Sequence, residues 1–257
     1  MKLLDVKSSN FFIYKVIIMK KTSFILLVCS LIFFCGYSQD SKYQVTYSIN
    51  LDKLYKNTEK ESLMDLFKMV ANTSKTVQLE LFINTNMAVF KEKKGMVVGD
   101  EIQDNLRKLV SINSYSGIWM SDLNKKRQIF VREFENKKFF VEKPLVTRNW
   151  QYSKETKTIQ GYLCHKATFV KTVPKGKFKI TAWYTKDIPV ALGPVDYVGE
   201  LPGLILELED ITATYKATTV KLKTDVIIKW PDEKDIITEK QYKKEGDKVM
   251  EFYKKSN

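Results

Sequence analysis

The residues best able to do chemistry in this sequence are a neighbouring cysteine and histidine. His165 is the only histidine in the chain, and Cys164 comes directly before it. Both lie in an alternating run typical of a strand, where adjacent side chains point to opposite faces. We therefore expect a buried Cys164 beside an exposed His165, rather than a catalytic thiol–imidazole pair.

The chain has few residues and no known motif that could bind a metal ion or a cofactor. A single histidine excludes multi-histidine zinc sites such as H-E-x-x-H. The patterns C-x-x-C, G-x-S-x-G, G-x-G-x-x-G and the P-loop are absent from the sequence. The sequence therefore predicts no catalytic residue, no metal site and no cofactor.

Four carboxylates lie in or near a segment, Lys186–Gly203, that is rich in proline and glycine. Such groups can act as a general acid and base or coordinate calcium. Their spacing matches neither a calcium loop nor a known catalytic motif, so a cryptic hydrolase is the less favoured alternative. The four residues are Asp187, Glu207, Glu209 and Asp210.

The segment from Lys186 to Gly203 is rich in residues that interrupt regular structure. It is too apolar to be disordered, so we expect an ordered loop. Aromatic rings beside it can stack on a sugar or line an apolar groove, although aromatic residues in strands are more often part of the core. The candidate binding residues are Trp183, Tyr184, Pro189, Gly193, Pro194, Leu201, Pro202 and Gly203.

Pro202 and Gly203 interrupt an otherwise apolar run. Proline fixes φ at the second position of a turn, and glycine tolerates the positive φ that a type II turn needs at the third. The sequence therefore predicts a type II turn with a positive φ at Gly203, followed by a core strand that begins at Leu204.

Apolar and polar residues alternate in many other windows, as in half-buried strands. Residues 45–51 and 77–83 each place an apolar residue at every second position. A change in the alternation predicts a bulge near Thr218. The expected hairpins are residues 127–144, turning at Asn136 and Lys137, and residues 155–171 with 177–184, turning at Pro174 and Gly176.

Two stretches show helical spacing instead. Residues 59–72 form one, and the other follows Thr238, which can cap a C-terminal helix. Together these elements predict an α+β fold, mainly β, with one antiparallel twisted or curved sheet, half-barrel-like, and one or two covering helices.

The N-terminal region has the pattern of a secretory signal peptide. Lysines follow Met19, an apolar stretch runs from Phe24 to Cys35, and small residues precede a cleavage point after Ser38. We expect residues 1–38 to be an N-terminal extension plus signal peptide, with Met19 the true start. Residues 39–257 are then expected to form a single domain.

Two alternatives for this region are less favoured. The apolar stretch is shorter than the roughly 20 residues that a membrane-spanning helix needs, so we expect no transmembrane segment after cleavage. Lipidation at Cys35 requires a small preceding residue, and Phe34 stands there.

Lysine dominates the formal net charge of +13. Nucleic-acid-binding proteins generally use arginine forks and clustered basic patches, but these lysines alternate with apolar residues, so we expect no nucleic-acid partner. Solvated strand faces explain the charge most simply, and attraction to an anionic membrane or an acidic glycan is the alternative.

The segment Trp183–Asp210, "WYTKDIPVALGPVDYVGELPGLILELED", resembles the signature block of the GLPGLI family of exported proteins from diderm bacteria. Residues 158–169 are similar to the second block of that family. Glu200 stands where the naming motif has its first glycine. The resemblance implies a secreted or periplasmic, mainly β protein without an established biochemical role, and it transfers no catalytic or binding residue.

These observations favour an exported, non-catalytic binding or carrier protein of the cell envelope. It would hold an apolar or extended ligand against the concave face of the sheet. The alternative is an accessory protein that docks on an outer-membrane transporter or envelope complex through the 186–203 loop. The expected partner is a hydrophobic ligand or an envelope protein, and the expected location is the periplasm or the outer membrane.

Overall fold

A computed structural model describes residues 42–56, 58, 60–93, 100–134, 137–223 and 225–256. All of them belong to one compact unit, Ser41–Asn257. The predicted signal peptide of residues 1–38, with its start at Met19 and cleavage after Ser38, lies outside the described residues, as does Asn136.

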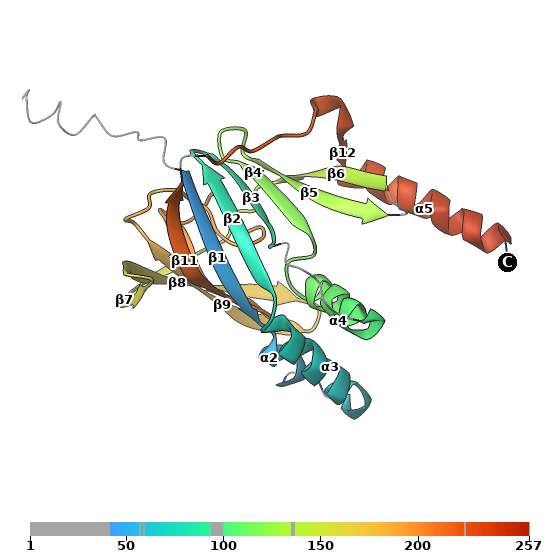
Figure 1. Cartoon of the computed structure of the whole chain (residues 1–257), viewed down its shortest axis with the longest axis horizontal. Helices are drawn as coiled ribbons and strands as arrows, with labels where there is room; N and C mark the ends of the chain where they lie inside the picture. The colour runs from blue at the N-terminus through green and yellow to red at the C-terminus, as the bar shows by residue number, and fades with distance from the viewer. Residues whose placement is uncertain are drawn as a thin grey trace, which may run out of the picture. The chain divides into compact units, whose positions relative to one another are not determined.

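Twelve strands form one open mixed sheet (Figure 1). Every neighbouring pair is antiparallel except β12 and β6, which are parallel. The predicted class, α+β and mainly β, is therefore confirmed.

The strand order is β12-β6-β5-β4-β3-β2-β1-β11-β10-β9-β8-β7. The bounds are β1 Lys42–Asn50, β2 Gln78–Asn84, β3 Met87–Glu92, β4 Ile118–Asp122, β5 Arg127–Phe134, β6 Lys137–Pro144, β7 Gln151–Ile159, β8 Tyr162–Val173, β9 Gly176–Thr185, β10 Leu204–Glu209, β11 Thr214–Lys223 and β12 Ile236–Thr238.

The hairpin predictions need two adjustments. Residues 155–171 are not one strand, because β7 and β8 meet in a tight turn at Gln160 and Gly161, whose φ angles of 51° and 82° suit a two-residue hairpin. Lys137 is not a turn residue either, since it begins β6 opposite Phe134.

Four helices lie among the described residues: α2 Asp52–Lys56, α3 Glu61–Ser74, α4 Glu101–Ile112 and α5 Glu239–Ser256. The predicted helices correspond to α3 and α5. The Thr238 hydroxyl accepts a hydrogen bond from the Gln241 backbone N–H at 3.2 Å, which caps α5. Helix α4 was not predicted, although the Asp100 carboxylate caps it by accepting from the Gln103 N–H at 3.0 Å.

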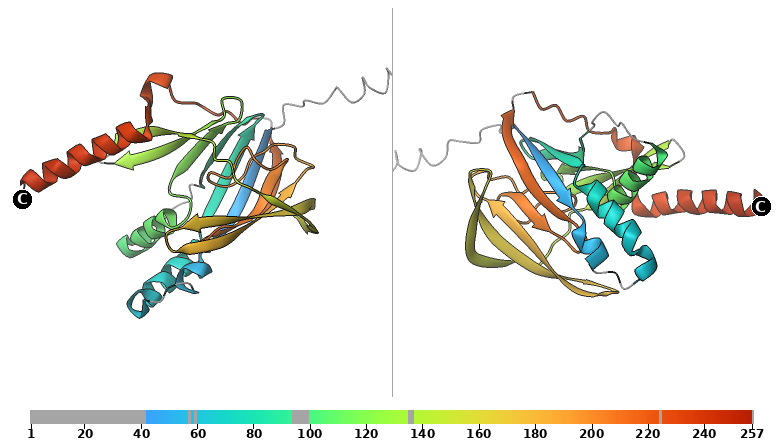
Figure 2. Two further views of the ribbon diagram at one scale, coloured as in Figure 1. Left: turned by 180° about the vertical axis from the view of Figure 1, so that it is seen from behind. Right: turned by 60° about the horizontal axis from the view of Figure 1, so that its bottom comes forward.

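The core lies on one face of the sheet, here called the inner face. The predicted apolar positions Tyr47 and Ile49 on β1 and Leu79 and Leu81 on β2 are buried there. The opposite side of the same strands is called the outer face. Helices α3 and α4 lie side by side beyond one end of β1 and β2 and add apolar side chains to the core (Figures 1 and 2).

The predicted bulge is confirmed at Thr218. Thr219 lies opposite Thr46 and Ala217 lies opposite Tyr47, so Thr218 is the extra residue of β11. Its hydroxyl donates a hydrogen bond to the Thr46 carbonyl at 3.2 Å. The bulge restores the inward direction of the apolar residues that follow the change in alternation.

The 186–203 loop is ordered and packs against the inner face. Ile188, Leu192, Tyr197 and Leu201 are all buried in the core. The loop also forms backbone hydrogen bonds with the start of β10, including Leu204 N–H to the Ile188 carbonyl at 3.1 Å. The chain itself therefore occupies the face on which the sequence analysis placed a ligand.

The type II turn predicted at Gly203 is wrong. The glycines with positive φ do not include Gly203, and its N–H donates to the Leu201 carbonyl at 2.8 Å across Pro202, as in a γ-turn. Glycine is needed there for space. A Cβ at Gly203 would lie 1.9 Å from the Thr185 carbonyl oxygen, because β10 starts against the end of β9.

We predict that Gly203→Ala lowers the free energy of unfolding by about 3 kcal/mol, because a methyl group there must push backbone aside. The matched control is Gly161→Ala. Gly161 has a φ of 82° with nothing within 4 Å of an added Cβ, so it should lose only about 1 kcal/mol from backbone strain. Urea denaturation measures both, and equal losses would contradict the close-approach explanation.

Candidate functional site

The eight sequence candidates do not form one surface. Five of them are buried, two are exposed and one lies on the other face of the sheet. Trp183 is half-buried on the outer face, with the Lys157 ammonium 4.2 Å from its ring centroid. Four of the buried residues belong to the loop itself, and a ligand could reach them only if the loop left the sheet. The buried residues are Tyr184, Gly193, Pro194, Leu201 and Gly203, and the exposed ones are Pro189 and Pro202.

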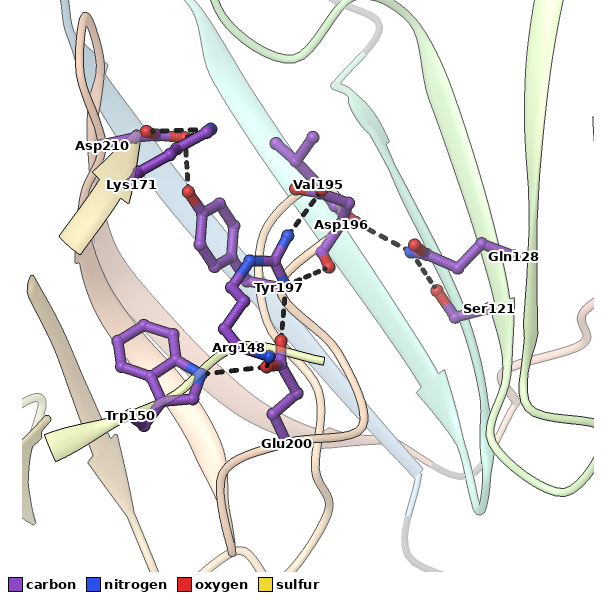
Figure 3. Close-up of polar contacts among 10 residues, drawn as sticks. All are labelled: Ser121, Gln128, Arg148, Trp150, Lys171, Val195, Asp196, Tyr197, Glu200 and Asp210. Atoms are coloured by element: carbon purple, nitrogen blue, oxygen red, sulfur yellow. Dashed lines mark hydrogen bonds and ion pairs between the residues drawn. The ribbon is translucent and has the colours of Figure 1, made fainter. Parts of the chain in front are cut away.

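A buried arginine holds the loop in place (Figure 3). Arg148 comes from the segment between β6 and β7, and its side chain is 7% exposed. Its guanidinium binds Asp196 at 2.6 Å and also binds Glu200, whose side chain is 10% exposed. The guanidinium lies over the Tyr197 ring, 4.3 Å from its centroid. Three side chains of the loop, those of Asp196, Tyr197 and Glu200, therefore contact one cation.

Glu200 forms hydrogen bonds in addition to its ion pair with the Arg148 guanidinium. Its carboxylate accepts hydrogen bonds from the Arg148 backbone N–H at 2.5 Å and from the Trp150 indole N–H at 3.2 Å. Glu200 stands where the GLPGLI motif, which this segment resembles, has its first glycine. The replacement supplies an anion beside a buried guanidinium.

Burial alone would lower the pKa of Arg148, but Asp196 and Glu200 raise it above its usual value. The arginine is therefore charged at every accessible pH. A charge buried to this degree is tolerated only while its partners stay in place. Removing the loop from the sheet would leave the guanidinium without them.

Two further contacts fix the loop on either side. The Tyr197 hydroxyl donates to Asp210 at 2.7 Å, and Lys171 lies 3.4 Å from the same carboxylate. Burial and the neighbouring Asp210 raise the pKa of Tyr197 well above its usual value. On the other side, the Gln128 amide donates to the Val195 carbonyl at 3.0 Å.

The remaining residues suited to catalysis are engaged elsewhere. Burial raises the pKa of the Cys164 thiol to about 11, which keeps it protonated. Glu207 forms an ion pair with Lys157 at 2.6 Å, and Glu209 lies 3.5 Å from Lys53. Within the described part of the chain, no three histidine, cysteine or acidic residues are grouped so that they could hold a metal ion.

A groove of about 580 Å³ opens on the outer face of β2–β6. Its floor consists of apolar side chains in cross-strand rows. Phe82 lies opposite Val89, which lies opposite Met120, and Ile118 lies opposite Val131, which lies opposite Phe140. This groove is a concave apolar surface that the described residues offer to a ligand.

Residues 225–232 are here called the strap, and the first part of the strap, residues 225–229, forms one wall of the groove. The strap belongs to the connection that runs from β11 to β12 (Figure 1). The Asn84 side-chain amide donates to the Val226 carbonyl at 3.0 Å at one end. At the other end, Arg127 lies against the Trp230 ring, 5.4 Å from its centroid, and binds Glu233.

The groove was not predicted from the sequence, although a signal for it was present. An antiparallel strand with one solvated face should alternate, yet residues 81–83 and 88–90 are consecutively apolar. Such runs indicate strands covered on both faces. Phe82 and Val89 are the outward members of these runs, and both lie in the groove floor.

One family model matches a short part of this chain. A family model described as a protein of unknown function (Porph_ging), the GLPGLI-type family, matches residues 171–207. No curated protein matches the sequence.

Two solved structures of PNGF-II, in space groups C2 and P21, are similar to this chain at 17% sequence identity, with TM-scores of 0.47 and 0.48. The matches cover 77% and 79% of this chain, but only 31% and 32% of PNGF-II.

Among the described helices, none is both long and apolar enough to cross a bilayer.

We predict that Glu200→Gln lowers the free energy of unfolding by about 3 kcal/mol, because it leaves the buried Arg148 only partly neutralised. Glu233→Gln is the matched control. It also breaks an arginine–glutamate pair, but the Glu233 side chain is 62% exposed, so its stability should change little. Urea denaturation compares the two variants, and equal effects would show that Arg148 does not depend on Glu200.

Proposed function

We propose that this protein is an exported, non-catalytic binding protein of the cell envelope that holds an apolar or extended ligand in the groove beneath the strap. The observation that carries the proposal is the groove itself. Its volume of about 580 Å³ falls within the range of about 300–1,000 Å³ for small-molecule sites in proteins.

The surroundings of the groove support an apolar ligand. Ile118 in the floor is partly exposed, and Ile227 in the strap is 82% exposed. Apolar side chains gathered around one concavity are unusual on a protein surface unless another molecule covers them.

The residues that line the groove support the proposal of a non-catalytic protein. Its polar lining consists of Gln44, Asp225 and lysine side chains. Cys164 and His165 lie on β8 and are not among the lining residues. The ligand would therefore be held rather than transformed.

Two observations support export to the envelope. Residues 1–38 have the pattern of a signal peptide, and the GLPGLI-type family model matches residues 171–207. The periplasm or the periplasmic side of the outer membrane is the location we propose.

The groove also favours binding over docking through the 186–203 loop. Most apolar side chains of that loop point into the core, and it is the exposed Pro189 and Pro202 that remain for a partner. Native mass spectrometry of the purified exported protein separates the two functions. A co-purified small molecule supports the groove, and a stable protein partner would favour docking.

We predict that the neutral dye N-phenyl-naphthylamine binds the protein and that Val131→Glu abolishes its fluorescence increase, because a carboxylate then lies in the apolar floor. Val170→Glu is the matched control. Val170 is 61% exposed on β8, away from the groove, so the same substitution should leave binding unchanged.

Melting temperatures of both variants show whether each is folded. Dye binding that survives Val131→Glu in folded protein, or that Val170→Glu removes equally, would contradict binding in the groove.

A further inference from the structure

We infer that the ligand of the groove is a long-chain carboxylate, with its alkyl chain along the floor and its anionic head among the lysines of the rim. This inference rests on the proposed function and adds a chemical class to it. It is carried by the charge of the lining residues and by the length of the floor.

Four lysines line the groove together with a single acidic residue, Asp225. Lys91 comes from β3, Lys138 from β6 and Lys223 from the end of β11, while Lys229 belongs to the strap. The excess of cations around an apolar floor is complementary to a molecule with an apolar body and an anionic head.

These lysines differ from three lysines on the other half of the sheet. Lys157, Lys166 and Lys171 there each form an ion pair with a carboxylate. Within the described residues, none of the four groove lysines has an ion-pair partner. Their ammonium groups are therefore available to a bound anion.

Lys91 shows how such a contact would be made. Its ammonium lies 5.2 Å from the centroid of the Phe82 ring, which belongs to the floor. The side chain thus folds over the apolar surface. A carboxylate at this place would meet a cation where the surrounding apolar atoms weaken screening by water.

The floor is long enough for an extended alkyl chain. It crosses five adjacent strands, from β2 to β6. Neighbouring strands lie about 4.8 Å apart, so the floor is about 19 Å across. Aliphatic and aromatic side chains along this path can bury an alkyl chain throughout its length.

The test compares dodecanoate with dodecanol by isothermal titration calorimetry, since the two probes share an alkyl chain and differ in charge. We expect one dodecanoate per chain, bound at least ten-fold more tightly than dodecanol. The double variant Lys91→Gln/Lys138→Gln should weaken dodecanoate binding at least five-fold and leave dodecanol binding unchanged. High salt should reduce the difference between the two probes.

A second double lysine variant, outside the groove, shows whether the effect on binding depends on where the charge is removed. Lys177→Gln/Lys179→Gln removes the same charge from β9, outside the groove, and should leave both affinities unchanged. Equal affinities for the two probes, or equal effects of the two double variants, would overturn the inference while leaving an apolar binding function intact. Failure of both probes to bind would overturn the proposed function itself.

Discussion

The buried cation of Arg148 is the interaction on which the arrangement of this protein depends. It joins the segment before β7 to Asp196 and Glu200 of the 186–203 loop. A guanidinium removed from water is tolerated only with its anions in place, so opening the loop would leave a buried charge unpaired. The Tyr197–Asp210 and Gln128–Val195 hydrogen bonds add fixed points on either side. The loop is thereby part of the core.

Because the 186–203 loop covers the inner face of the sheet, the proposed ligand must bind elsewhere. A curved sheet ordinarily offers its concave side, but here apolar residues of the loop, such as Leu192 and Leu201, fill that side. The outer face of β2–β6 carries a second apolar surface, and the strap covers only part of it. The remaining groove is apolar at its floor and cationic at its rim. These two properties together define the proposed ligand.

Much of the fold could be predicted from the sequence, because strand periodicity is a local property. The alternation of residues 45–51 and 77–83, the bulge at Thr218 and the cap at Thr238 all depend on neighbouring residues. Helix α4 was not predicted, although Ile102, Leu106, Leu109 and Val110 stand at helical spacing along it, so a local signal was present there as well. The contacts of the candidate site could not be predicted in the same way. Gly203 is constrained by the carbonyl of Thr185, and the partner of Glu200 is 52 residues away. Local pattern cannot reveal such contacts.

Hydrogen exchange measured by mass spectrometry, with and without saturating dodecanoate, tests the central claim most directly. The claim is that ligand binds beneath the strap while the 186–203 loop stays on the inner face. Amide exchange should slow in the strap, residues 225–232, and in β4, and it should stay unchanged in residues 186–203. Slower exchange in residues 186–203 with no change in the strap would contradict the account, because it would place the ligand on the face that Arg148 keeps closed.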